Sequence, residues 1–284
     1  MKRIYITGAQ GFTGHHVLPV LLEQGYEFIQ ASADLLHAEA LATEVMNAKP
    51  THVLHLAAIA FVGHADIKDM YVTNIVGTRN LLEALKPIQG LQKIVLASSA
   101  NVYGNSLSSP LKESEQPAPA NDYAVSKLAM EYLARLYMPQ LPIVLARPFN
   151  YTGPGQSVSF LIPKLVAAFK RRDTVIELGN LDVYREFNDV RLLCSAYGLL
   201  LAHGKAGSVV NICSGQMHAL RSVIAMLEEL TNHRPSIQVN PAFVRTNEVI
   251  RLGGDPTVLR ELATRSCWAL PNFTLRDTLA EMLE

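Results

Sequence analysis

A tyrosine and a lysine four residues apart form the pattern in this sequence with the clearest chemical use. Tyr123 and Lys127 lie in residues 122–137, a segment that predicts a helix. This spacing places both side chains on one helix face, with their Cβ atoms about 5–6 Å apart. A phenol has an ordinary pKa of about 10, and a neighbouring cation favours its ionised form. The pair could therefore exchange a proton with a substrate, although a surface helix can carry the same two residues without catalysis.

Ser99 comes just after residues 93–97, a short apolar segment that predicts a buried strand. In parallel sheets covered by helices, ligands bind beyond the carboxyl ends of the strands. A hydroxyl group at that position can hydrogen-bond a substrate oxygen whose charge changes during a reaction. Serine is also an ordinary turn residue, so Ser99 becomes informative only together with Tyr123 and Lys127.

Three glycines separate the first predicted strand from the first predicted helix. Gly8, Gly11 and Gly14 have the spacing Gly-x-x-Gly-x-x-Gly directly after residues 3–7. Glycines at such a turn permit a tight backbone path and a close approach to a pyrophosphate, which a helix N-terminus also favours. An ordinary strand-to-helix turn can have this spacing, but its place after the first strand indicates dinucleotide binding.

Short apolar segments alternate with longer helical patterns over the first 150 residues, and these elements must position the side chains above. Strands are predicted near residues 3–7, 27–31, 53–57, 93–97 and 143–146. Helices are predicted from the glycine turn to about residue 23 and near 36–48, 68–85 and 122–137. The alternation predicts an α/β fold with a doubly wound parallel sheet.

After Asn150 this rhythm breaks. Helices are predicted near 157–172, 189–203 and 219–230, strands near 175–178 and 209–213, and an irregular tail follows. We expect a core of residues 1–150 with returning segments near 185–213. A smaller C-terminal substrate-binding lobe, formed by 151–184 and 214–284, would cover a ligand cleft.

The composition limits the class of protein. The 284 residues include 25 basic and 25 acidic side chains, and 49% of the residues are apolar. No basic run is longer than Lys170-Arg171-Arg172, which argues against nucleic acid or an anionic membrane as the main partner. Three widely separated cysteines fit a reducing compartment, and no segment has the roughly 20 apolar residues of a membrane helix. We expect a cytoplasmic protein; His15 and His16 lack a third ligand, so no metal site is expected.

Five segments, in order along the chain, resemble the extended short-chain dehydrogenase/reductases that act on nucleotide sugars. They are the Thr-Gly-x-x-Gly-x-x-Gly turn, His55-Leu56-Ala57-Ala58, Asn74 in Asn-x-x-Gly-Thr, the set Ser99, Tyr123 and Lys127, and Arg147-Pro148-Phe149-Asn150. The resemblance covers nearly the whole chain and implies a Rossmann-type fold. It implies that Tyr123 is the catalytic acid/base and that Ser99 hydrogen-bonds a sugar oxygen. Lys127 would hold the nicotinamide ribose and lower the pKa of Tyr123.

The resemblance also implies that the chain binds NAD(P)H. Asp34 lies about 20 residues after Gly14, the spacing of an acid that accepts the ribose 2′-hydroxyl of NAD. The segment Gln30-Ala31-Ser32 has no acid and would tolerate the 2′-phosphate of NADP, and in relatives a pair like Asp34-Leu35 contacts adenine instead. The choice between NAD and NADP therefore stays open. The residues assigned to the cofactor are Gly8, Gly11, Phe12, Thr13, Gly14, Asp34, Leu35, Leu56, Ala57, Ala58, Asn74, Tyr123, Lys127 and Pro148.

Residues of the second lobe resemble the substrate contacts of the same family. Asn150 resembles an asparagine near the substrate diphosphate, and Arg185 resembles an arginine whose guanidinium fork clamps nucleotide or phosphate. Residues 245–249 and 252–256 resemble a stretch of GDP-mannose 4,6-dehydratases, although Thr246 stands where those enzymes have proline. The predicted substrate-binding residues are Ser99, Asn101, Asn150, Lys164, Arg185, Arg245 and Glu248.

The residues after Ser99 narrow the expected reaction. Dehydratases of this family carry acids there, whereas Ala100 and Asn101 cannot titrate. A 4-ketoreductase or a 4-epimerase remains, and residues 146–156 and 210–215 most resemble reductases that convert GDP-4-keto-6-deoxy-D-mannose to GDP-D-rhamnose. A dTDP- or UDP-sugar substrate stays open. A cofactor-sensing protein without catalysis is a third alternative, although such proteins often lose the tyrosine or the lysine.

The helices expected near 68–85 and 122–137 have apolar faces. Relatives use these faces for a four-helix dimer contact, and a face buried inside one chain would give the same pattern. We expect a homodimer on the basis of the resemblance.

Overall fold

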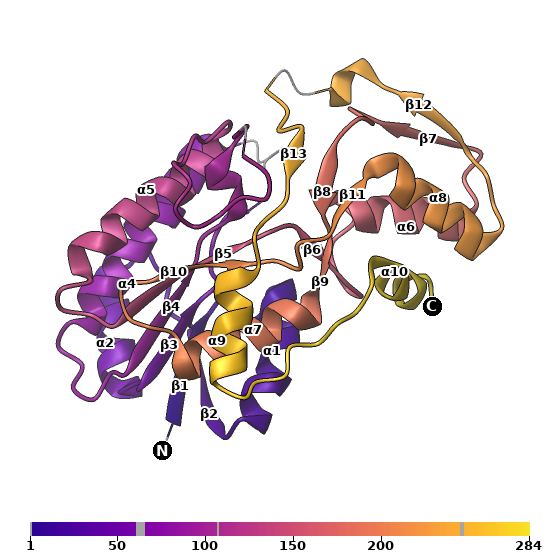
Figure 1. Ribbon diagram of the computed structural model, residues 1–284. Helices are drawn as coiled ribbons and strands as arrows, with labels where there is room; N and C mark the ends of the chain where they lie inside the picture. Colours follow the sequence, from indigo (N-terminus) through magenta and orange to yellow (C-terminus); the bar gives the residue numbers. More distant parts are fainter. Residues whose placement is uncertain (1, 61–65, 107, 245–246) are drawn as a thin grey trace.

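The computed structural model describes residues 2–60, 66–106, 108–244 and 247–284. Its centre is a six-stranded sheet in the order β10-β5-β4-β3-β1-β2, with every pair parallel (Figure 1). The chain moves outward from β1 to β2 and then crosses back to β3, so the strand order reverses between β1 and β3. Ligands of such sheets bind at this switch point, beyond the carboxyl ends of the strands. The strands are β1 (Lys2–Thr7), β2 (Tyr26–Gln30), β3 (His52–His55), β4 (Lys93–Ala97), β5 (Ile143–Pro148) and β10 (Val209–Ile212).

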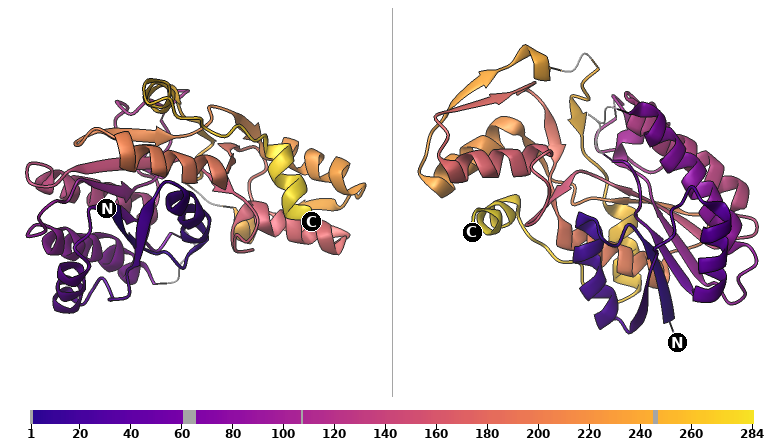
Figure 2. Two further views of the ribbon diagram at one scale, coloured as in Figure 1. Left: turned by 90° about the horizontal axis from the view of Figure 1, so that it is seen from below. Right: turned by 180° about the vertical axis from the view of Figure 1, so that it is seen from behind.

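Helices cover both faces of this sheet (Figure 2). Successive side chains of a strand point to opposite faces, so Ile4 and Ile6 of β1 pack in one hydrophobic core and Tyr5 packs in the other. The result confirms the α/β, doubly wound, Rossmann-type fold expected from the sequence. The first core contains α1 (Phe12–Glu23), α7 (Val190–His203) and α9 (Thr257–Arg265), and the second contains α2 (Ala38–Ala48), α4 (Thr78–Leu85) and α5 (Asp122–Tyr137).

The helix expected over residues 68–85 is widened in its middle. A short helix, α3 (Ile67–Tyr71), leads into one π-helical segment, η1 (Val72–Gly77), before α4 continues. Such widened turns often occur at functional sites, and Asn74 lies in this one. The predicted long helix is confirmed, since residues 67–85 are helical throughout, but the spacing of apolar residues does not reveal the local widening.

A smaller lobe is built from the later part of the chain (Figure 1). Its hydrophobic cluster lies among α6 (Leu161–Arg171), α8 (Leu220–Thr231) and α10 (Leu275–Leu283). The tail beyond residue 237, expected to be irregular with one or two short helices, contains α9 and α10 and also adds a strand to two of the three small sheets. These sheets are β8 (Tyr184–Glu186) with β11 (Met217–Ala219) and β13 (Arg251–Leu252), β7 (Val175–Leu178) with β12 (Ser236–Val239), and β6 (Tyr151–Thr152) with β9 (Asn188–Asp189).

The end of the chain contributes to both parts of the molecule. Leu259 and Ala263 of α9 pack into the central core, although they belong to the 214–284 stretch that we assign to the lobe. Leu275 and Leu279 of α10 pack into the lobe itself. The division into two parts remains our proposal. In the described ranges, no helix combines the length and the apolar character needed to cross a membrane.

Candidate active site

The glycine turn lies at the switch point of the sheet, against the residues that follow β3. Gly8 has a φ of +74°, and a Cβ there would lie 2.7 Å from the backbone nitrogen of Ala57. A Cβ on Gly14 would lie 2.3 Å from the carbonyl oxygen of Ala9, so both positions require glycine. Gly11 precedes α1, whose first turn contains no acid and, among described residues, has no side-chain cap. The N–H groups at the N-terminus of α1 therefore fit the pyrophosphate of a dinucleotide.

Phe12 and Thr13 connect this turn to β6. The hydroxyl oxygens of Thr13 and Tyr151 are 2.8 Å apart. The ring of Phe12 stacks on that of Tyr151, with 6.1 Å between their centroids. Tyr151 also acts electrostatically on Tyr123, so it is a site residue that the sequence reasoning missed. Its position directly after Asn150 was the available signal.

Tyr123 and Ser99 share a hydrogen bond, and Asn101 donates two hydrogen bonds to Ser99. Tyr123 lies in the first turn of α5, which Asn121 caps by accepting the N–H of Ala124 at 2.9 Å. The Oγ of Ser99 accepts hydrogen bonds from the backbone and side-chain nitrogens of Asn101, at 3.2 and 3.1 Å. Its own proton is then left for donation, here to the hydroxyl oxygen of Tyr123. Burial raises the pKa of Tyr123, and the hydrogen bond with Ser99 opposes this shift.

Lys127 is buried and points to the sheet. Its Nζ donates to the carbonyl oxygen of Ala97, the last residue of β4, at 2.7 Å. Burial lowers the pKa of Lys127 to about 8, and the charge of Glu131 opposes that shift. That Lys127 lowers the pKa of Tyr123 stays a prediction. The ammonium faces Ala97 and Glu131, and burial dominates at Tyr123.

A buried ion pair lies beneath these residues. Arg147 of β5 binds Glu131 of α5 through two hydrogen bonds, of 2.8 and 2.6 Å, and both side chains are almost completely buried. Glu131 also accepts the hydroxyl of Ser98 at 2.5 Å, and Arg147 donates to the hydroxyl of Tyr103 at 3.0 Å. The sequence signal for Glu131 was its position four residues after Lys127, on the same helix face.

The predicted cofactor residues after β3 and β5 surround the same edge of the sheet. Leu56, Ala57 and Ala58 follow β3, Pro148 ends β5, and all four are half-buried. Asn74 is buried, and its amide holds this region together. It accepts the N–H of Ile59 at 2.9 Å and donates to Ser126 Oγ at 2.9 Å. That these residues contact a cofactor stays a prediction.

Asp34 and Leu35 follow β2. The Oδ1 of Asp34 accepts the N–H of Leu36 at 2.9 Å, and its carboxylate lies 3.6 Å from the ring of His37. Leu35 is buried, and its carbonyl oxygen accepts the side chain of Asn80 at 2.9 Å. The Asp34 carboxylate therefore stabilises the turn in which it lies. A role of Asp34 or Leu35 in cofactor binding stays a prediction.

Two of the predicted substrate residues bind each other. Arg185 and Glu248 form an ion pair of 2.9 Å, and Arg185 also donates to the carbonyl oxygens of Val249 and Tyr184. Lys164 lies elsewhere in the lobe, where its Nζ donates to the carbonyl oxygen of Glu177 at 3.2 Å and sits over the ring of Phe243. Asn150 is half-buried, and its carbonyl oxygen accepts two hydrogen bonds from Asn188. Arg245 lies outside the described residues.

Glu186 is a further carboxylate that the sequence reasoning missed. It is fully buried and accepts the N–H groups of Gly254, Ser214 and Gly215, at 2.6, 2.9 and 3.2 Å. Burial raises its pKa against these hydrogen bonds. One side chain therefore fixes two loops of the lobe, and its adjacency to Arg185 in the sequence was the only signal.

Residues 4–213 match the NAD dependent epimerase/dehydratase family. The chain belongs to this family. Membership confirms the resemblance drawn from the sequence and the NAD(P)-dependent oxidoreductase class. It agrees with the fit of the glycine turn to a dinucleotide.

Two relatives match over most of the chain. GDP-6-deoxy-D-talose 4-dehydrogenase of Aggregatibacter actinomycetemcomitans is 34% identical over 264 residues, with 90% of each chain covered. GDP-6-deoxy-D-mannose reductase of Pseudomonas aeruginosa is 34% identical over 297 residues, covering 99% of this chain and 96% of that protein.

Two solved structures have the same fold. A protein of Burkholderia cenocepacia J2315, provisionally assigned as an epimerase, has 43% identity and a TM-score of 0.91, with 99% of this chain and 97% of that chain covered. RMD of Pseudomonas aeruginosa, in complex with NADPH, has 33% identity and a TM-score of 0.90, with 100% and 98% covered.

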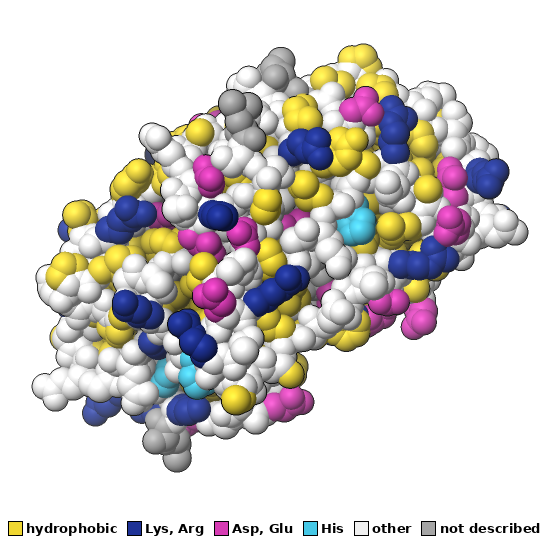
Figure 3. All heavy atoms as spheres, in the orientation of Figure 1, with side chains coloured by type: hydrophobic (Ala, Val, Ile, Leu, Met, Phe, Trp, Pro, Cys, Tyr) yellow, Lys and Arg dark blue, Asp and Glu magenta, His cyan; other side chains and the backbone are white. Residues whose placement is uncertain are grey.

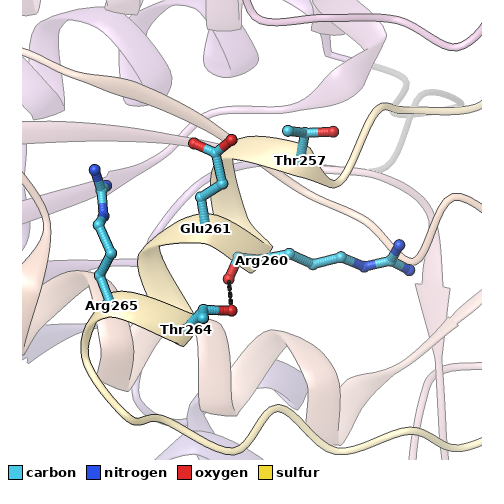
Figure 4. Close-up of a pocket in the computed structure, with 5 residues that line it drawn as sticks. All are labelled: Thr257, Arg260, Glu261, Thr264 and Arg265. Atoms are coloured by element: carbon cyan, nitrogen blue, oxygen red, sulfur yellow. Dashed lines mark hydrogen bonds between the residues drawn. The ribbon is translucent and has the colours of Figure 1, made fainter.

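A hollow of about 370 Å³ lies against α9, apart from the candidate site residues described above. All residues that line this hollow come from that one helix: Thr257, Arg260, Glu261, Thr264 and Arg265 (Figure 4). The guanidinium of Arg260 already donates to the carbonyl oxygen of Ser214 at 2.8 Å. None of the predicted site residues lines the hollow, and we assign it no part in the reaction.

We expect Arg147→Met to lower the free energy of unfolding by about 3–5 kcal/mol, because Glu131 would keep a buried charge without its partner. The double variant Glu131→Met/Arg147→Met should recover a large part of the loss. Unfolding in urea measures the free energy of unfolding of the single and the double variant. The control Arg171→Met breaks an exposed ion pair with Asp173 and should cost no more than about 1 kcal/mol. Equal losses for the two single variants would contradict the role given to the buried pair.

Proposed function

We propose that the enzyme reduces the C4 keto group of a nucleotide-linked 4-keto-6-deoxyhexose. The proposed substrate is GDP-4-keto-6-deoxy-D-mannose and the proposed product is GDP-D-rhamnose. The carrying observation is the hydroxyl pair of Ser99 and Tyr123 with no acid at the two positions after Ser99, where Ala100 is buried and the Asn101 amide donates to Ser99. The names of both relatives support it, because each contains a GDP-6-deoxyhexose and an oxidation or reduction.

NAD(P)H held at the glycine turn of Gly8, Gly11 and Gly14 would supply the hydride for C4. Tyr123 donates its phenolic proton to O4 as negative charge develops there, and its raised pKa keeps the phenol protonated beforehand. Ser99 can donate its hydroxyl proton to the same oxygen because Asn101 already fills its acceptor positions. Lys127, one helical turn beyond Tyr123, supplies positive charge at the ribose side of the site.

A 4-epimerase on the same scaffold is the second candidate, since the family includes such enzymes by name. Its first step takes a proton from O4, so Tyr123 would have to act as a base. A raised pKa makes a phenol a weaker acid, so it does not separate the two reactions. The names of the two relatives, a dehydrogenase and a reductase, favour the reductase.

The substitution Tyr123→Phe should lower the turnover of GDP-4-keto-6-deoxymannose by about 10²–10⁴-fold, because the proton donor to O4 is lost. Binding of NADH should change by no more than about twofold. The decrease in NAD(P)H absorbance measures turnover. Tyr132→Phe is the matched control, because Tyr132 is an exposed tyrosine on the same helix.

Wild-type protein should oxidise NAD(P)H in proportion to the GDP sugar and respond weakly to dTDP-4-keto-6-deoxyglucose. Oxidation with the dTDP sugar alone would overturn the choice of nucleotide. Full turnover by the Tyr123→Phe variant would overturn the mechanism. Conversion of GDP-D-rhamnose to its C4 epimer without net cofactor oxidation would establish the epimerase instead.

We also propose that two copies pair through α5. Val125, Tyr132 and Leu136 share one side of this helix by their spacing and are 38%, 55% and 72% exposed. The substitution Leu136→Glu should convert the dimer to a monomer in sedimentation velocity, because it places a charge in the apolar contact. Leu22→Glu, on α1 at 50% exposure, should leave the dimer intact. A monomeric wild-type protein would contradict the proposal.

We place the enzyme in the cytoplasm. All three cysteines are free thiols, and Cys267 is exposed, which suits a reducing compartment. On the face shown in Figure 3, Lys and Arg side chains are interspersed with acidic and hydrophobic ones. This pattern suits a small-molecule substrate better than an extended polyanion.

A further inference from the structure

One carboxylate holds the loop that follows β2. Glu44 belongs to α2, and its Oε1 accepts the hydroxyl of Tyr5 at 2.5 Å and the N–H of Ser32 at 3.0 Å. Its Oε2 accepts the N–H of Ala33 at 2.9 Å and the hydroxyl of Ser32. Three donors of the loop and one of the central sheet therefore converge on a single side chain.

The place of this carboxylate in the fold is informative. In dinucleotide-binding sheets, an acid about 20 residues after the glycine turn, at the end of the second strand, accepts the ribose 2′-hydroxyl. Ser32 is exposed and follows Gly14 by 18 positions (residues 14 to 32), two residues beyond the end of β2. Neither Gln30, Ala31 nor Ser32 is acidic. Glu44 brings a carboxylate to this position from the next helix.

The charge state of Glu44 suits such a role. Burial alone would raise its pKa, but the hydrogen bonds from Ser32, Tyr5 and Ala33 outweigh burial and lower it. The carboxylate is therefore ionised at neutral pH. The loop and Tyr5 fill its acceptor positions, so the carboxylate acts on a ligand through its charge, which repels a phosphate dianion.

A 2′-phosphate would need hydrogen-bond donors at this position. The donors that the loop offers are the Ser32 hydroxyl and the N–H groups of Ser32 and Ala33, and all of them bind Glu44. The sequence alone suggested that Gln30-Ala31-Ser32 tolerates a 2′-phosphate because it has no acid, and it offered Asp34 as the acid at the usual spacing. In the structure Asp34 accepts the N–H of Leu36, and Glu44 brings a carboxylate to Ser32 from α2.

We propose that Glu44 determines the cofactor preference by placing a negative charge behind the loop that faces the ribose 2′ position and by occupying the donors of that loop, and that the enzyme prefers NADH to NADPH. The proposal rests on the nicotinamide-cofactor part of the proposed function and is independent of the sugar. It would distinguish this chain from the Pseudomonas aeruginosa relative that was solved with NADPH.

Isothermal titration of the full-length protein with NADH and with NADPH, without sugar, tests the proposal. We expect wild-type protein to bind NADH at least about tenfold more tightly than NADPH. Glu44→Gln keeps the size of the side chain and removes its charge, so the ratio of the two Kd values should fall by about tenfold, through tighter NADPH binding. Glu44→Ala should lower the ratio as well, because it frees the loop donors.

Two control variants separate the local contact from other effects. Glu39→Gln removes an exposed charge from the same helix and should leave the ratio unchanged. Tyr5→Phe removes the hydrogen bond to Glu44 but keeps the carboxylate, so it should also leave NADH preferred. Thermal unfolding of each variant shows whether it is folded.

Equal Kd values in wild-type protein, or a ratio that Glu44→Gln does not move, would overturn the role of Glu44 and leave the proposed reduction standing. A ratio that Glu39→Gln lowers as much as Glu44→Gln would also overturn it, since charge alone would then suffice. Failure of wild-type protein to bind either cofactor would overturn the proposed function itself, and the role of Glu44 with it.

Discussion

The buried ion pair between Glu131 and Arg147 constrains the rest of the site. Two charges in the interior are stable only when each satisfies the other with good geometry, because an unpaired buried charge costs several kcal/mol. The pair joins α5 to β5, and Ser98 at the end of β4 completes it. Each partner is close in sequence to a residue of the site: Ser98 to Ser99, Glu131 to Lys127, and Arg147 to Pro148. Fixing the pair therefore fixes the carboxyl edge of the sheet, where the candidate site residues lie.

Next to this pair, hydrogen bonds determine which protons Ser99 and Tyr123 can donate. Asn101 donates twice to Ser99, so the serine proton is left for another acceptor, and burial keeps Tyr123 protonated. Both hydroxyl groups therefore keep a proton that a ligand oxygen could accept. Two carboxylates each hold loops elsewhere in the fold. Glu186 holds the loops of the lobe, and Glu44 holds the loop after β2.

The sequence predicted the parts of this arrangement that depend on local patterns. The glycine spacing and the alternation of strands and helices were sufficient for the fold, and the Tyr123–Lys127 spacing placed the acid/base pair on one helix face. The widened turn at Asn74 was not predictable, because it depends on an amide that binds Ile59 and Ser126 across the fold. The pairing of Arg185 with Glu248 joins residues 63 positions apart. Likewise, Glu44 acts on a loop of another element, which no spacing rule reveals.

The most direct test of this account is the fate of deuterium from NADH labelled with deuterium at the transferred position. The protein would be incubated with GDP-4-keto-6-deoxy-D-mannose, and the product examined by NMR. The account predicts one deuterium at C4 of the sugar for each NADH oxidised, with the configuration of GDP-D-rhamnose at C4. Deuterium at C4 with the talose configuration would contradict the proposed product. Sugar turnover without deuterium would contradict the central claim that the enzyme is a reductase.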